Sequence, residues 1–415
     1  MPDPRVDGRR LLARLDALAE IGAIEGGGNC RLAFGDADRA GRDLVVTWMR
    51  DLGLQVSIDA IGNVVGVRPG EIDGPPVMCG SHIDTVRTGG RYDGNYGVLA
   101  GLEVIETLDE RGIRTHHPLA VAFFSNEEGA RFAPDMMGSL VYVGGLALEE
   151  ALDTIGIDGA RAGDELARIG YVGTTPCPGP PPRAFVELHI EQGPVLEREG
   201  RTIGVVEGVQ GISWQELTIE GQSNHAGTTP MRFRHDAAYA AGAIVTFVRR
   251  LARDLSGAQV GTVGSLRVEP DLVNVVASRA VLTVDLRNTD DAVLREAEDR
   301  LAGFTQQLAH DEGVRITSRR LARFEPVAFD RRVVDLVERT ADRLGLSTLR
   351  MPSGAGHDAQ MLARVCPTGM IFVPSVGGLS HNPAEHTELS DLEAGANVLL
   401  HTLLALAAPE GVIDP

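Results

Sequence analysis

Two apolar runs that stop abruptly at clusters of ionisable residues constrain this chain more than any other feature. Residues 76–79 lead into the cluster Gly80–Thr85, and residues 119–124 lead into the cluster Ser125–Gly129. Short apolar runs bounded by glycine or proline are typical of buried strands in a parallel sheet. Because ligands collect at the carboxyl ends of such strands, we expect both clusters to lie on one rim of an α/β sheet.

The rest of the chain predicts the sheet and one insertion. Strands alternate with amphipathic helices at both ends of the sequence, which indicates an α/β fold with a mostly parallel sheet. The helices are expected at 6–20, 36–52, 96–108, 331–344 and 391–407, and the strands at 54–58, 63–67, 183–193 and 370–372. The weaker pattern of residues 130–182 predicts only a short helix at 136–145 and a proline-rich loop at 173–182.

Between residues 211 and 326 the order of elements changes. The expected order is strand 214–219, helix 236–254, strands 261–268 and 280–287, helix 291–312 and strand 315–321. This β-α-β-β-α-β order is ferredoxin-like and complete in itself. We therefore expect residues 211–326 to be a domain inserted into a discontinuous domain of residues 1–210 and 327–415.

Composition excludes several classes of protein. The 39 basic and 58 acidic residues of this 415-residue chain give a net charge of −19, which argues against binding nucleic acid or an anionic membrane. All the basic residues are Arg, so a Schiff-base or P-loop lysine is excluded. The four Cys lie far apart, which indicates neither a disulfide framework nor a thiolate zinc site. No signal peptide or membrane-spanning run is visible, so a cytoplasmic location is expected.

The first cluster contains residues that suit a metal ion. His82 and Asp84 stand two apart on the predicted strand, so their side chains leave the same face. His82 could bind a metal ion while Asp84 orients an imidazole, and a hydrogen-bonded surface pair is the alternative. Asp93 follows Gly89 and Gly90, whose flexible backbone would let it reach the same rim. A turn aspartate is the alternative for Asp93.

The second cluster and two remote histidines extend this set. Glu127 and Glu128 repel each other unless a cation lies nearby, so one could bind a metal ion while the other is a general base with a raised pKa. An acidic pair at a helix N-terminus is the alternative. His189 interrupts an apolar strand, where a satisfied half-buried histidine is the commoner case, and His381 lies on a polar loop. The candidate metal ligands are therefore His82, Asp93, Glu128, His189 and His381. With Asp93 as a bridge, ligands of these types would suit two metal ions.

Three further features could bind substrate. The polar loop 224–230 contains His225, and Asn274 begins the arm that leads to the strand ending at Arg287. Arg287 could hold a carboxylate bidentately, although an ordinary exposed arginine is the alternative. The glycine-rich loop 353–358 contains Gly356 and could present N–H groups to an anion, unless it is only a capped helix N-terminus.

These motifs together resemble the M20 metallopeptidase superfamily over nearly the whole chain. They are Gly-Ser-His82-Ile-Asp84-Thr, Asp93-Gly, Asn-Glu127-Glu128-Gly, the late Ser-His381 and the ferredoxin-like insertion. The segment Glu187–Gly193 is similar to the amidohydrolase branch, which comprises N-carbamoyl-L-amino acid hydrolases, β-ureidopropionases and allantoate amidohydrolases. Peptidase members typically carry a carboxylate where this chain has His189.

The resemblance implies roles for these residues and a reaction. It implies two divalent ions (Zn, Mn, Co or Ni) bound by the five ligands above, with Glu127 as general base. We expect Asp84 and His225 to be catalytic residues as well. It implies substrate contacts from Gln192, His225, Asn274 and Arg287, and a homodimer formed through the inserted domain, with His225 offered across the dimer. The expected reaction is hydrolysis of an N-carbamoyl-L-amino acid, with allantoate or a β-ureido acid as alternatives. His189 disfavours a peptidase, and the intact ligand set disfavours a binding protein without catalysis.

Overall fold

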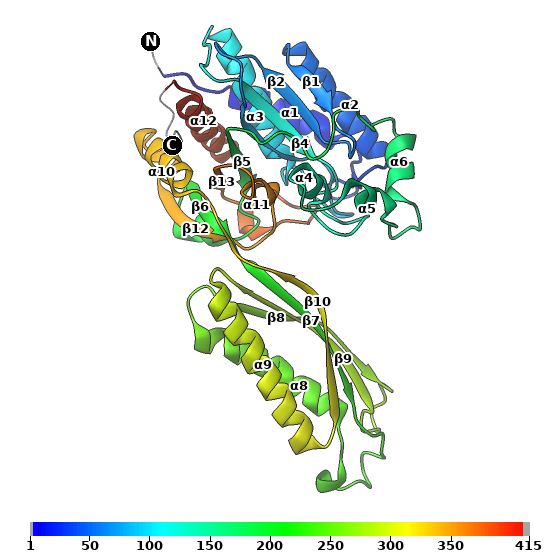
Figure 1. Cartoon of the computed structure of the whole chain (residues 1–415). Coiled ribbons are helices and arrows are strands. Elements are labelled where there is room, and N and C mark those ends of the chain that lie inside the picture. Colours follow the sequence, from blue (N-terminus) through cyan, green and yellow to red (C-terminus); the bar gives the residue numbers. More distant parts are fainter. Residues whose placement is uncertain (1–2, 410–415) are drawn as a thin grey trace. The chain divides into compact units, whose positions relative to one another are not determined.

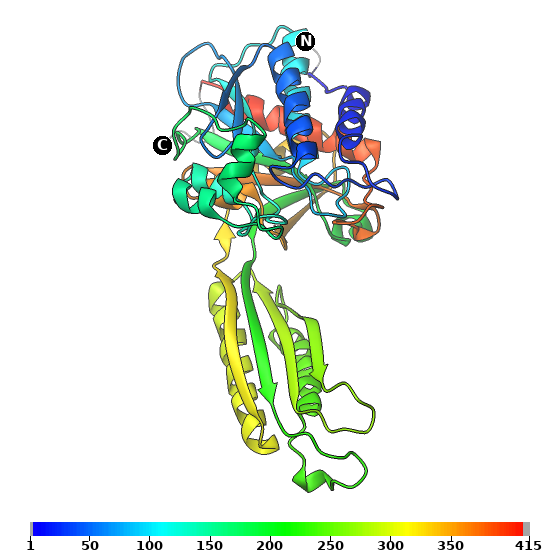
Figure 2. The ribbon, with the colours of Figure 1, turned by 90° about the vertical axis from the view of Figure 1, so that its right-hand side faces the viewer.

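The structure, a computed structural model, describes residues 3–409 and divides the chain into two compact units. The first unit comprises the residues up to 208 and those from 328 onward, and the second comprises residues 209–327. The two units are described separately below (Figures 1 and 2). Within the described residues, no helix combines the length and the apolar character needed to cross a bilayer.

The first unit is built on one large sheet. Its strands are β1 (Gln55–Ile58), β2 (Val64–Arg68), β3 (Val77–His82), β4 (Leu119–Phe124), β5 (Ala184–Ile190), β6 (Ile203–Val209), β11 (Val327–Ala328), β12 (Thr348–Ser353) and β13 (Thr368–Val373). Its α-helices are α1 (Gly8–Ala19), α2 (Asp36–Asp51), α3 (Asn95–Glu110), α4 (Met137–Tyr142), α5 (Leu148–Asp153), α6 (Ala162–Arg168), α7 (Val195–Glu199), α10 (Arg331–Arg343), α11 (Asp358–Leu362) and α12 (Leu389–Leu406).

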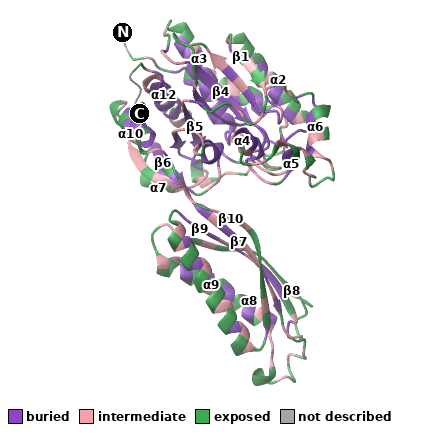
Figure 3. Cartoon of the chain, viewed as in Figure 1, coloured by how far each residue is buried: buried purple, intermediate pink, exposed green. Residues whose placement is uncertain are grey.

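The strands are ordered β1-β2-β4-β3-β5-β13-β6-β11, and β12 also pairs with β6. The four central strands β4, β3, β5 and β13 are parallel, whereas β2 and β6 flank them in antiparallel directions. All residues of these four strands are buried (Figure 3), as expected for parallel strands covered on both faces. The predicted mostly parallel α/β sheet is therefore confirmed.

The pairing of β3 with β4 brings the two polar clusters together. The two strands run parallel in a register that places His82 beside Phe124. The segments that follow them, which contain Asp84 and Glu127, therefore leave the sheet at the same edge. On the other side of β3, strand β5 delivers His189 to that edge.

The second unit is an antiparallel sheet covered by two helices. Its elements are β7 (Gly211–Glu220), α8 (Ala237–Leu255), β8 (Val260–Glu269), β9 (Arg279–Asn288), α9 (Asp291–Glu312) and β10 (Arg315–Phe324), with a short 3-10 turn (Met231–Phe233) before α8. The sheet order β10-β7-β9-β8 and the element order confirm the predicted ferredoxin-like pattern. Asp236 and Asp290 cap the starts of the helices by accepting backbone N–H groups.

Several elements were not predicted from the sequence. Residues 130–182 contain α5 and α6 besides the expected α4, and the chain also forms α7, β6, β11 and β12. Helix α11 begins at Asp358, where a helix N-terminus was the alternative to an anion-binding loop. The three unpredicted helices have five to seven residues each, too few for hydrophobic periodicity to become visible. Residues 173–182 lack regular structure, as predicted.

A buried arginine ties the segments near the sheet edge together. Arg31 is fully buried, and burial lowers the pKa of its guanidinium to about 10. Its Nε donates to the carbonyl oxygen of Ile83 at 2.6 Å, and its Nη2 donates to Oδ1 of Asn95 at 2.8 Å. Its Nη1 donates to the carbonyl oxygens of Leu18, in the last turn of α1, and of Ile21, just beyond that helix. One side chain therefore joins α1, the segment after β3 and the start of α3.

Arg31→Met should destabilise the first unit, because it leaves buried carbonyl groups without donors. We expect the free energy of unfolding to fall by at least about 2 kcal/mol, measured by urea denaturation. The control Arg201→Met, at an exposed position, should change it by less than about 0.5 kcal/mol. Equal effects of the two substitutions would contradict this role of Arg31.

Candidate metal centre

The carboxylate of Asp93 lies at the centre of the candidate site. Its Oδ1 is 3.1 Å from Nε2 of His189 and 3.6 Å from Nε2 of His82. Its Oδ2 is 3.5 Å from Nε2 of His381, which is 3.1 Å from Oε2 of Glu128. The structure thus brings the five expected ligands together as two groups that share Asp93. The first group is His82, Asp93 and His189, and the second is Asp93, Glu128 and His381.

Backbone carbonyl groups orient two of the imidazoles. Nδ1 of His82 lies 2.9 Å from the carbonyl oxygen of Asp84, and Nδ1 of His189 lies 2.8 Å from the carbonyl oxygen of Ile190. A hydrogen on Nδ1 satisfies each carbonyl group, so Nε2 is the nitrogen of each ring that faces Asp93. The expectation that the Asp84 carboxylate orients an imidazole therefore differs from the structure, in which the Asp84 carbonyl group does so.

The Asp84 carboxylate instead holds the turn that carries the two glutamates. It accepts hydrogen bonds from the backbone N–H groups of Glu127 at 3.2 Å and Glu128 at 3.3 Å. Burial raises the pKa of Asp84 to about 6. Asp84 thus supports the segment after β4.

Unusual backbone conformations gather in this region. Asn126, Gln192 and His381 have φ angles of 53°, 58° and 53°, in the left-handed region that few residues other than glycine adopt. Gly94 has a φ of 66°, and a Cβ atom there would lie 2.4 Å from the His82 ring. Strained positions of this kind are characteristic of functional sites.

The charges of both groups favour a bound cation. Although burial opposes the charged imidazole, Glu127 and Asp93 raise the pKa of His82 well above its ordinary value. Although burial also opposes the Asp93 carboxylate, His189 and His82 hold its pKa well below the ordinary value. The hydrogen bond to Glu128 raises the pKa of His381 to about 9. Carboxylate oxygens and imidazole nitrogens in these positions are a donor set that fits divalent metal ions.

Glu127 lies beside the first group. Its side chain is largely buried, and its Oε2 lies 3.4 Å from Nε2 of His82. Burial raises the pKa of Glu127 well above its ordinary value, as suits a carboxylate that exchanges protons.

Two expected substrate residues also lie in this unit. The side-chain amide of Gln192 donates to Oδ2 of Asp93 at 2.9 Å, and its amide oxygen is buried without a hydrogen-bond partner among the described residues. A Cβ atom on Gly356 would lie 2.9 Å from the side chain of Met136, whose backbone N–H donates to the carbonyl oxygen of Glu127. Gly356 therefore lies close to the Glu127 segment.

The site contains residues to which the sequence assigned no role. Glu187, His357 and Asp358 are buried beside the first group, and Glu187 and His357 form a further cluster with His189. Ser380 and Glu385 contact the Asp93 segment. The sequence offered two signals for these residues: Glu187 stands two residues before His189, and Glu385 stands four residues after His381.

The remaining expected substrate residues lie in the second unit. Nδ1 of His225 accepts backbone N–H groups from Gly227 at 3.1 Å and Thr228 at 3.2 Å, so Nε2 carries the hydrogen and can donate it. The backbone N–H of Ala226 donates to the carbonyl oxygen of Asn274, which brings His225 and Asn274 onto neighbouring segments. Arg287 donates to the carboxylate of Asp285 from Nε and Nη2.

Arg287 and Asn274 do not meet within one chain. Strand β9 begins at Arg279, and Arg287 lies near its end. Asn274 precedes the start of β9, on a segment that pairs with the segment of His225 beyond the end of the β7–β9 pairing. At about 3.3 Å per residue, β9 alone separates Arg279 from Arg287 by roughly 25 Å. Within one chain, Arg287 and Asn274 therefore lie too far apart to hold the same small carboxylate.

Comparisons with known proteins agree with the motifs. The profile of peptidase family M20/M25/M40 matches residues 78–405. The N-carbamoyl-L-amino-acid amidohydrolase of Rhizobium meliloti is 42% identical, with 97% of each chain covered. The allantoate amidohydrolase of Escherichia coli K12 is 36% identical, with 94% of this chain and 96% of that protein covered. The crystal structure of an amidase of the hydantoinase/carbamoylase family from Burkholderia multivorans has a TM-score of 0.96 and 47% identity, covering 99% and 100% of the two chains.

Proposed function

Because the chain belongs to peptidase family M20/M25/M40 and is a hydrolase of non-peptide C–N bonds, we propose that it cleaves the ureido group of N-carbamoyl-L-amino acids with two divalent metal ions. The observation that carries this proposal is the convergence of five ligand side chains on Asp93, with the buried carboxylate of Glu127 beside them. Two relatives that are 41–42% identical and named for N-carbamoyl-L-amino acids support the choice of substrate.

The residues of the centre suit each step of this hydrolysis. Two divalent cations, when bound, would polarise the ureido carbonyl group and lower the pKa of a water molecule. Glu127 takes a proton from the attacking water and delivers it to the departing α-nitrogen. His225, through its Nε2–H, donates to the oxygen that gains negative charge. The bond between the carbamoyl carbon and the α-nitrogen breaks, and the resulting carbamic acid decomposes to CO2 and ammonia.

Arg287 would make the site selective for a carboxylate-bearing ureide. Guanidinium groups bind carboxylates through planar, two-point contacts, and Arg287 makes such a contact with Asp285 through Nε and Nη2. Allantoate, which carries a ureido group beside a carboxylate, is the second candidate substrate, because an allantoate amidohydrolase is 36% identical to this chain.

A panel of substrates tests this function. With added Mn²⁺ or Zn²⁺, the protein should release ammonia from N-carbamoyl-L-amino acids and far less from N-alkylureas that lack the carboxylate. Glu127→Gln should lower kcat by about 10²-fold or more while metal content stays unchanged, because only proton transfer is lost. The control Glu338→Gln, at a surface ion pair, should leave kcat unchanged. Near-normal kcat in Glu127→Gln would contradict the base, and release from allantoate alone would favour the second candidate.

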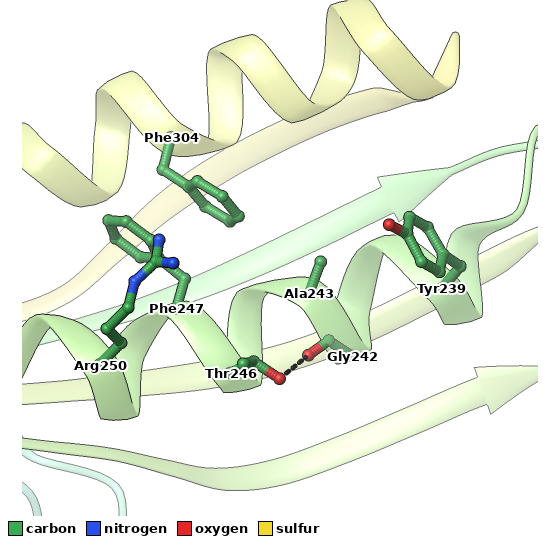
Figure 4. A pocket seen from close by; sticks show the side chains of 7 residues that line it. All are labelled: Tyr239, Gly242, Ala243, Thr246, Phe247, Arg250 and Phe304. Carbon is green, nitrogen blue, oxygen red and sulfur yellow. Dashed lines mark hydrogen bonds between the residues drawn. The ribbon is translucent and has the colours of Figure 1, made fainter.

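We propose further that the substrate site is completed in a homodimer. Since Arg287 and His225 lie toward opposite ends of β9, one small substrate could contact both only if they came from different copies of the chain. The inserted unit offers a surface for such contact on the outer face of α8 and α9 (Figure 4). A hollow of about 460 Å³ lies there between the exposed Tyr239 and the stacked rings of Phe247 and Phe304, whose centroids are 4.0 Å apart.

Mixing two inactive variants tests this arrangement. His225→Ala and Glu127→Gln chains, co-expressed, should form mixed dimers in which one centre has both Glu127 of its own chain and His225 of the partner. Random pairing would restore about a quarter of the wild-type activity. Each variant alone is the control, and the absence of any restored activity in purified mixed dimers would contradict a contribution of His225 across the dimer.

A further inference from the structure

The carboxylate of Asp93 needs support, because its segment lies outside the helices and strands. The segment 89–94 contains three glycines, and α3 begins only at Asn95. A bridging ligand must keep both oxygens directed at their separate groups of side chains. Flexible backbone alone would let the carboxylate rotate or withdraw. The structure therefore has to fix Asp93 through contacts from elsewhere in the chain.

Glu385 fixes the backbone of this segment. Its Oε1 accepts hydrogen bonds from the backbone N–H groups of Tyr92 at 2.9 Å and Asp93 at 3.2 Å. The side chain is buried, with 3% of the residue exposed. A Cβ atom on Gly90 would lie 2.1 Å from the Glu385 carboxylate, so the glycine lets Glu385 lie directly against the backbone.

Ser380 contacts the carboxylate itself, on the same Oδ2 to which the side-chain amide of Gln192 donates. The Oγ of Ser380 lies 2.9 Å from Oδ2 of Asp93 and 3.1 Å from Oε2 of Glu385. The hydroxyl group lies between the two acidic side chains and donates its single hydrogen to one of them at a time. Ser380 also immediately precedes His381, whose Nε2 lies 3.5 Å from the same Oδ2. The six-residue segment from Ser380 to Glu385 thus supplies one candidate ligand and holds another.

The two groups around Asp93 depend on these contacts unequally. The group on the Oδ1 side, with His82 and His189, is entirely buried. The group on the Oδ2 side includes the partly exposed Glu128 and the exposed His381. Ser380 contacts only Oδ2, and His381 is carried by the same segment. Loss of the support should therefore disturb the Oδ2 side first.

We infer that Ser380 and Glu385 are positioning residues that hold Asp93 and His381 in place for the metal ion on the Oδ2 side. This inference rests on the proposed two-metal function and extends it by naming what keeps the second ion bound. Residues that orient metal ligands commonly change metal affinity by 10–100-fold when they are substituted. Here substitution should weaken the binding of one of the two metal ions.

Titration of the metal-free protein with Co²⁺ tests this inference, with visible absorption and calorimetry as readouts. The wild-type protein should bind two equivalents. Ser380→Ala should weaken one binding step by about 10- to 100-fold and leave the other unchanged. Ser380→Thr, which keeps the hydroxyl group, should restore the weakened step. In a His381→Ala background, which removes one of the ligands on the Oδ2 side, Ser380→Ala should have little additional effect.

Glu385 can be tested in the same way. Glu385→Ala should weaken the same step, whereas the amide of Glu385→Gln can still accept the two backbone N–H groups and should restore much of the binding. Two matched controls should leave both steps unchanged. Ser347→Ala removes a hydroxyl group that accepts the N–H of Thr202, and Asp59→Asn alters a buried carboxylate that accepts the N–H groups of Ile61 and Asn63.

The outcomes separate the inference from the proposed function. Two wild-type binding steps that Ser380→Ala leaves unchanged would overturn the inference and leave the metal function standing. Equal weakening of both steps, together with a lower Tm, would show only general damage and also overturn it. A wild-type protein that binds no Co²⁺ would contradict both.

Discussion

The shared carboxylate of Asp93 is the interaction on which the candidate site depends. Its oxygens face two separate groups, His82 with His189 and Glu128 with His381. These ligands come from the ends of β3, β4 and β5 and from a loop near the C-terminus. The parallel order β4-β3-β5 places three of the contributing segments at one edge, which is why this sheet can build such a centre.

The same concentration of charge makes the centre costly to bury without a cation. Acidic groups in a buried cluster must either be protonated or be balanced by positive charge. The raised pKa values of His82 and His381 show that the acids draw protons onto the imidazoles. A metal ion would take the place of those protons, so metal binding would be coupled to proton release. Arg31 and Asp84, which hold the surrounding segments, keep this arrangement in position.

Much of the fold and of the centre could be predicted from the sequence, because the informative residues lie at strand ends. The apolar runs before His82 and Glu127 fixed two parallel strands, and the change in element order identified the inserted ferredoxin-like unit. Short helices such as α5 and α6 were not predicted, because they span too few turns. The sequence assigned no role to Ser380 and Glu385, because their contacts with the Asp93 segment join parts of the chain nearly 300 residues apart. The distance between Asn274 and Arg287 was not predicted, because it depends on β9 running from Arg279 to Asn288 between them.

The spacing of two metal ions is the most direct test of the account, because a bridging Asp93 requires them to be close. Electron paramagnetic resonance of the Mn²⁺-loaded protein should show magnetic coupling between two ions about 3.5–4 Å apart. Asp93→Asn, which weakens the bridge, should lower the metal content and abolish the coupling. Two bound ions that give only the spectrum of isolated Mn²⁺, or a single ion per chain at saturation, would contradict the bridged centre.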